Sequence, residues 1–160
     1  MNRRFFSVLL LWVGLWQPVF GADQSLLNLD SAGVALQSYD PVAFFTVGGP
    51  VKGMEQWQSE FHGAKYRFHS AKNKALFDAT PAKYEPQFGG YCAYGVGRGV
   101  LVPIKVEAWQ IVDGRLLLQK NLSIRDDFNR DPQGNLTQAD SHWKRLQGAA
   151  EKHRTGSTQR

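Results

Sequence analysis

The fold is decided first by residues 57–68, which read WQSEFHGAKYRF. Apolar and polar side chains alternate on both sides of His62-Gly63, a pair that suits a two-residue turn between antiparallel strands. This turn places Trp57 opposite Phe68 and fixes which side chains share a face. The side chains on the apolar face are then Trp57, Phe61, Tyr66 and Phe68. The stretch therefore predicts a β-hairpin with one buried face.

A second hairpin is predicted around Asp113-Gly114, which is another favoured two-residue turn. The strands on either side are rich in apolar residues, and the register places Trp109 opposite Leu118. The core side of this hairpin is predicted to consist of Trp109, Ile111, Leu116 and Leu118. Like the first hairpin, it needs a partner layer that covers its apolar face.

Helices are predicted between and after the hairpins. Ser70 can cap a helix over residues 71–79, and Pro81 ends that helix because proline restricts the residue before it. A last helix is predicted over residues 137–146. The two hairpins and these peripheral helices predict an α+β fold with a small antiparallel sheet.

The segment before the first hairpin predicts further strands. Residues 39–45, YDPVAFF, are rich in residues that favour β structure and predict a strand after a tight turn. In that turn Asp40 is expected to accept hydrogen bonds just before Pro41. A short strand is also predicted over residues 34–36.

The N-terminus has the pattern of a signal peptide. Met1–Arg4 is positively charged, Phe5–Trp16 is apolar apart from one serine, and small residues follow at Gly21 and Ala22. The apolar run is shorter than the roughly 20 residues that span a bilayer, so no permanent membrane span is predicted in the mature chain. We therefore expect an exported protein, periplasmic or secreted, with a signal peptide over residues 1–21.

The remainder predicts one domain over residues 22–147 and a disordered tail over residues 148–160, where only small, polar and charged residues occur. The formal charge is +5, and it falls to +3 when Arg3 and Arg4 are removed with the signal peptide. The basic residues form no long block. Nucleic acid is therefore not an expected partner.

The stretch Phe88–Gly95 contains the only cysteine, Cys92, between two tyrosines and beside paired glycines. The glycines allow a sharp turn, and the residues after them can begin a short helix whose start favours a thiolate. A single cysteine cannot form an internal disulfide, so in an oxidising compartment this thiol is either buried or used. Cys92 is the first candidate for chemistry.

Several motifs follow one another in a defined order: residues 39–45, 66–70 and 89–94, with Phe77, Pro81 and Tyr84 among them. Together they resemble the YHS domain family, in its branch of exported single-domain proteins. The tyrosine, histidine and serine of the family name correspond to Tyr66, His69 and Ser70. The resemblance implies a YHS-like fold and a metal-binding role, with copper or another soft metal ion as the cofactor.

Soft-metal binding without turnover is therefore the expected function, and the protein is not expected to be an enzyme. Cys92 would supply a thiolate ligand and His69 a nitrogen ligand, since these are donors that soft metals prefer. Tyr66 and Tyr91 would shape the site around them. The partner would be the metal ion itself.

Two alternatives stay open. The first is a non-catalytic accessory module that docks on an exported partner protein, which accounts for the lack of catalytic motifs. The second is a thiol-dependent redox enzyme, with Cys92 as nucleophile and a histidine as its base. A thiol that stays unreactive until the protein unfolds would show that Cys92 belongs to the core.

Overall fold

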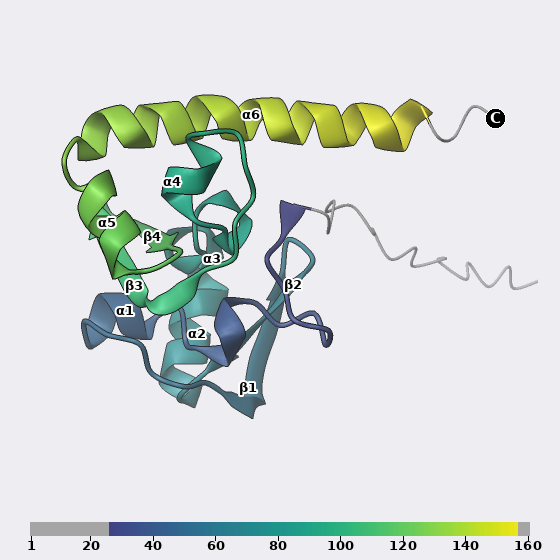
Figure 1. The fold of residues 1–160 in the computed structure, drawn as a ribbon. Coiled ribbons are helices and arrows are strands. Elements are labelled where there is room, and N and C mark those ends of the chain that lie inside the picture. The colour runs from purple at the N-terminus through teal and green to yellow at the C-terminus, as the bar shows by residue number, and fades with distance from the viewer. Residues whose placement is uncertain (1–25, 157–160) are drawn as a thin grey trace, which may run out of the picture.

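The structure is a computed structural model that describes the backbone of residues 26–156 and the side chains of residues 26–152, so the predicted signal peptide lies outside it. Strands β1 to β4 are Met54–Phe61, Ala64–Phe68, Lys105–Val112 and Arg115–Gln119. Helices α1 to α6 are Ala43–Thr46, Ala71–Ala79, Pro81–Tyr84, Ala93–Val96, Leu122–Phe128 and Pro132–Gly156. The predicted α+β fold is confirmed, but the two hairpins form two separate two-stranded sheets instead of one (Figure 1).

Both predicted hairpin turns are confirmed. His62 and Gly63 have φ angles of 49° and 81°, and Asp113 and Gly114 have φ angles of 51° and 73°. Two successive positive φ values are the signature of a turn whose twist matches that of the flanking strands. The turn residues alone therefore specify where β1 passes into β2 and β3 into β4.

The register of the first hairpin follows the prediction near the turn and departs from it at the far end. Phe68 is paired with Met54 and not with Trp57, because the register shifts between Met54 and Gln58. Gly53 lies so close to β2 that a Cβ atom there would be 2.5 Å from the carbonyl carbon of Arg67. The irregularity in β1 thus goes with a close backbone approach that only glycine permits.

The second hairpin has the predicted register, with Trp109 opposite Leu118 and Ile111 opposite Leu116. The predicted core position of Ile111 is wrong, since its side chain is 36% exposed. Leu117, on the opposite face of β4, is fully buried instead. The reason is that β4 is covered on both faces, a situation that a pattern of alternating burial does not describe.

Three apolar clusters form the core. The first cluster, against β1–β2 and α2, contains Ala35, Val42, Ala64, Tyr66, Phe68, Phe77 and Tyr84. The second cluster, on one face of β4, contains Leu36, Phe44, Cys92, Ile104, Val106, Leu116 and Leu118. The third cluster, on the other face of β4, contains Phe88, Ala93, Val96, Leu117, Phe128, Leu136 and Ala139. Every buried member of these clusters lies between residues 35 and 139.

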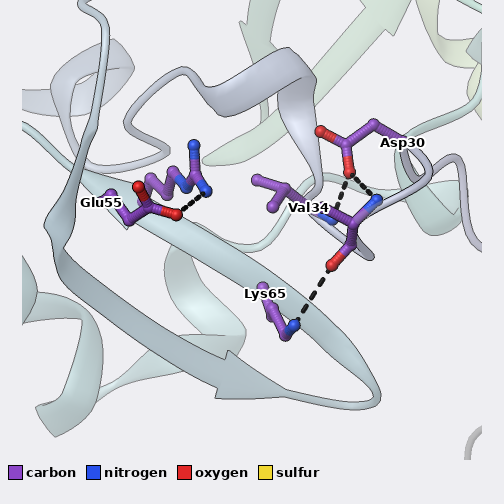
Figure 2. A network of polar contacts seen from close by, with 6 residues as sticks. Asp30, Val34, Glu55 and Lys65 are labelled. Atoms are coloured by element: carbon purple, nitrogen blue, oxygen red, sulfur yellow. Dashed lines mark hydrogen bonds and ion pairs between the residues drawn. The ribbon is translucent and has the colours of Figure 1, made fainter.

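The segment before α1 lies along the edge of β2 (Figure 2). Asp30 Oδ1 accepts hydrogen bonds from the backbone N–H groups of Ala32 and Val34, both at 2.9 Å, and Lys65 Nζ donates to the Ala32 carbonyl at 3.2 Å. Val34 forms a parallel bridge with Lys65. The predicted strand over residues 34–36 is thus reduced to isolated bridges, because the chain turns into a 3₁₀ segment at Leu36–Ser38.

The predicted strand over residues 39–45 is wrong, since the chain forms α1 there. Asp40 Oδ1 accepts from the backbone N–H groups of Val42 at 2.8 Å and Ala43 at 3.3 Å. These bonds confirm Asp40 as the turn acceptor and hold the amides in a turn, where a strand would have extended them. A local side-chain bond thus overrides the β preference of the sequence.

The other carboxylate oxygen of Asp40 reaches across the fold. Oδ2 accepts from the backbone N–H of His69 at 2.8 Å and from Asn73 Nδ2 at 2.7 Å. Asp40 is fully buried, so these bonds replace the water that its carboxylate has lost. One side chain therefore joins the start of α1 to the corner between β2 and α2. At the same corner Ser70 caps α2 as predicted, accepting from the Asn73 N–H at 3.2 Å.

Helix α6 is much longer than the predicted helix over residues 137–146. Its first half packs on the third cluster through Leu136, Ala139 and Trp143, and Arg115 holds Asp140 by two bonds of 2.9 and 2.7 Å. The second half runs beyond the rest of the fold (Figure 1). Despite this length, no helix within residues 26–156 is apolar enough to cross a bilayer.

Residues 148–156, for which composition predicts a disordered tail, continue α6 in the structure. Composition alone suggested disorder because these residues bury little. Helix propagation, however, needs no burial once packing has formed the first turns, and the segment contains good helix formers such as Ala149, Ala150 and Lys152. Residues 157–160 lie outside the described residues.

Replacement of Asp40 by asparagine is expected to lower the free energy of unfolding by about 2 to 4 kcal/mol, because an amide group cannot accept all four bonds and buries an unmatched donor. Urea denaturation followed by tryptophan fluorescence measures the change. The matched control is Asp126→Asn, at an exposed position of α5, with an expected change within about 0.5 kcal/mol. Equal effects of the two variants would contradict the anchoring role of Asp40.

Replacement of Gly148 by proline is expected to reduce the helical circular dichroism signal, because proline in a helix interior costs about 3 kcal/mol. Replacement by alanine should increase the signal, and the structure shows open space for its Cβ atom. If residues 148–156 were disordered, both variants would have the spectrum of the parent protein.

Candidate functional site

The candidate site is built where the chain turns from the 3₁₀ segment Phe88–Gly90 into α4. Gly89 and Gly90 have φ angles of 60° and 80°, and a Cβ atom on Gly89 would be only 1.9 Å from the Leu26 carbonyl oxygen. The paired glycines therefore allow a sharp turn that passes close to the backbone of Leu26. The expected short helix follows, with Cys92 at its N-terminal boundary.

The surroundings of Cys92 are apolar. Its side chain is 2% exposed and belongs to the second cluster, between Phe44 and the leucines of β4. Its backbone N–H donates to the Val102 carbonyl at 3.0 Å, and the residue bridges to Leu118. Of the two possibilities for a lone thiol, burial is the one that the structure adopts.

Within the described residues the thiol has one polar contact, with the side chain of Gln119 at the end of β4. Cys92 Sγ donates to Gln119 Oε1 at 3.2 Å, and the backbone N–H of Tyr94 donates to the same oxygen at 3.0 Å. The Tyr94 N–H can only donate, which fixes the orientation of the amide group. Gln119 is fully buried and thus ties the start of α4 to β4.

The amide nitrogen of Gln119 is different, because Nε2 is buried and has no hydrogen-bond partner in the described part of the chain. An unpaired buried donor costs roughly 1 to 3 kcal/mol. The fold therefore uses the Oε1 atom of Gln119 as an acceptor and makes no use of its Nε2 donor. The sequence contains one sign of this role, because Gln119 follows three leucines in a predicted strand. No sequence rule, however, identifies such a glutamine as a buried hydrogen-bond acceptor.

His69 lies in a different environment from Cys92. Its side chain is exposed at the corner between β2 and α2, and only its backbone N–H is engaged, with Asp40. No hydrogen bond joins the His69 and Cys92 side chains within the described residues. The structure thus places the two expected metal ligands in separate surroundings, one solvated and one in the core.

Tyr66 and Tyr91 are likewise not gathered around Cys92. Tyr66 is buried in the first cluster, where burial raises the pKa of its phenol and the nearby Glu85 carboxylate raises it further. The phenol is therefore neutral at neutral pH. Tyr91 packs against the third cluster, and its hydroxyl donates to the Leu27 carbonyl at 3.3 Å.

The other described histidines are occupied elsewhere. His62 Nδ1 lies 3.2 Å from Glu85 Oε2, and burial raises the pKa of this carboxyl while His62 opposes the shift. His142 on α6 lies against the glycine loop at Gly99. No three His, Cys, Asp or Glu side chains converge on a metal position within residues 26–152.

The donors around Cys92 decide whether a soft metal ion fits there. The thiol of Cys92 is the only donor of the expected set in the second cluster, and its neighbours there are hydrocarbon side chains. Soft-metal sites need several thiolate, imidazole or thioether donors at one point. The residues around Cys92 therefore do not fit such a site, and copper binding stays a prediction from the resemblance alone.

Comparison with protein-family models, with curated proteins and with solved structures finds no match for this chain. The resemblance to the YHS domain family is therefore neither supported nor contradicted, and it stays a prediction. The site must be interpreted from its own geometry. That geometry is of a buried thiol and amide that connect a turn, a short helix and a strand.

Replacement of Gln119 by methionine is expected to lower the free energy of unfolding by about 1 to 3 kcal/mol, because the Tyr94 N–H loses its acceptor in the core. Methionine has about the length of glutamine and lacks the unpaired Nε2 donor. Loss of the Oε1 acceptor is therefore the main contribution to the change in the free energy of unfolding. Gln138→Met, at an exposed position of α6, is the matched control, with an expected change within about 0.5 kcal/mol. Chemical denaturation of both variants measures the difference, and a neutral or stabilising Gln119→Met would contradict the role of the oxygen.

Proposed function

We propose that this protein is an exported, non-catalytic binding module. The observation that carries the proposal is that the second half of α6 extends past the core, and that the side chains of residues 144–152 are mostly exposed to solvent. Between residues 144 and 152 only Leu146 and Ala150 are partly covered. A helix that is held firmly at one end and solvated at the other is suited to docking.

The groups best suited to chemistry support the same proposal, because each has a structural use. The Cys92 thiol is buried and bonded to Gln119, and the Asp40 carboxylate accepts four hydrogen bonds. A nucleophilic thiol needs access to substrate and a neighbouring base. Burial among hydrocarbon side chains provides neither, which disfavours the thiol-dependent redox enzyme.

Export is part of the proposal and rests on the signal-peptide pattern over residues 1–21. In an oxidising compartment, an accessible lone thiol would be prone to oxidation or mixed disulfides. Burial of Cys92 agrees with a protein that works there without using its cysteine. The protein is periplasmic or secreted under this proposal.

Alkylation of Cys92 by iodoacetamide is expected to be at least roughly 100-fold slower in the native protein than in urea, because the thiol becomes accessible only on opening of the core. Mass spectrometry of timed samples measures the rate. The control is Ser141→Cys in a Cys92→Ser background, which places a thiol on an exposed position of α6 and should react as fast as a free peptide thiol.

A thiol that reacts rapidly in the native protein would overturn the non-catalytic proposal. Anaerobic titration with Cu(I) provides the second measurement. Sub-micromolar binding that disappears in both Cys92→Ser and His69→Ala would instead establish the predicted metal site. Binding that is absent, or unchanged in both variants, agrees with the proposal.

A further inference from the structure

The net positive charge of residues 26–156 lies in the second half of α6. Residues 144–156 carry four lysines and arginines and one glutamate, a formal charge of +3, whereas residues 26–143 carry twelve basic and twelve acidic residues and are balanced. Such asymmetry between two parts of one chain indicates an electrostatic partner. We call residues 144–156 the distal segment.

The distal segment has two distinct faces. At 100° per residue, Lys144, Arg145 and Lys152 lie within about 100° of one another on one side of the helix. Trp143, Leu146 and Ala150 lie on the opposite side, and these are the residues that remain partly covered. The cationic face is therefore turned away from the core.

The cationic face lacks the anchors of a protein interface. Protein interfaces depend on buried aromatic and large apolar side chains, and by helical spacing the other residues of the distal segment on this face are Gly148 and Thr155, neither of which is such an anchor. Three cations on one face of a helix, without apolar anchors among them, match an anionic surface that attracts them by charge alone. Lys144 and Arg145 are exposed to meet it.

We propose that the cationic face of the distal segment binds an anionic phospholipid membrane surface. The inference rests on the proposed function, because it names the partner of that docking helix. Each basic side chain near such a surface contributes about 1 kcal/mol, so binding by this segment is weak, reversible and sensitive to salt. The binding is peripheral, in agreement with the lack of a membrane-spanning helix in residues 26–156.

The test is sedimentation with vesicles of phosphatidylglycerol and phosphatidylcholine. The protein starts at Ala22, which removes the apolar run of residues 5–16 and retains all three core clusters. We expect binding to anionic vesicles at low salt, and little binding to pure phosphatidylcholine or at high salt. Lys144→Glu/Arg145→Glu should weaken binding by roughly 10-fold or more.

The matched control is Lys72→Glu/Lys120→Glu, which makes the same change in net charge at exposed positions outside α6. It should bind within about 2-fold of the parent protein. Equal losses of vesicle binding in the two variants would show that net charge alone causes the effect. This result would overturn the inference. Equal binding to neutral vesicles would also overturn it.

A third arm separates lipid from acidic protein as the partner. Immobilised polyglutamate that captures the parent protein but not Lys144→Glu/Arg145→Glu, without any vesicle binding, would assign an acidic polypeptide and overturn the lipid inference. That result leaves the docking proposal standing, whereas a rapidly alkylated Cys92 overturns the non-catalytic proposal whatever the vesicles show. Failure of the lipid inference can thus be distinguished from failure of the non-catalytic proposal.

Discussion

The buried carboxylate of Asp40 is the constraint on which the first half of the structure depends. A charged group is stable inside a protein only when hydrogen bonds replace its hydration, and Asp40 obtains four of them from three separate segments. Two of these bonds create the turn into α1, and the other two hold the corner between β2 and α2. The carboxylate therefore fixes both a local conformation and a tertiary contact, and neither can change without the other.

The second half is organised around β4, which is buried on both faces. Leu116 and Leu118 pack into the second cluster, while Leu117 packs into the third, so the strand separates two layers of apolar side chains. Gln119 closes this strand, and its oxygen holds both the Cys92 thiol and the Tyr94 N–H. The cysteine that stood out in the sequence is thus a component of the core that positions α4.

The hydrogen bonds of Asp40 and Gln119 bear directly on the function of the protein. The most reactive side chains form hydrogen bonds within the fold, whereas the surplus positive charge lies on the second half of α6, beyond the residues that this helix contributes to the third cluster. The reactive side chains and the surplus positive charge therefore lie in different parts of the structure. This separation is what led us to propose a binding module.

The sequence by itself determined the elements whose signal is local: both two-residue turns, the registers next to them, the Ser70 cap and the α+β class. Tertiary structure decided the rest. The strand predicted at residues 39–45 became a turn and helix because Asp40 accepts hydrogen bonds from the amides of Val42 and Ala43, and Leu117 is buried because the core lies on both sides of β4. Cys92 and His69 carry the right chemistry for one site, but no local pattern encodes the distance between them. Only the packing of the chain placed one in the core and the other in solvent.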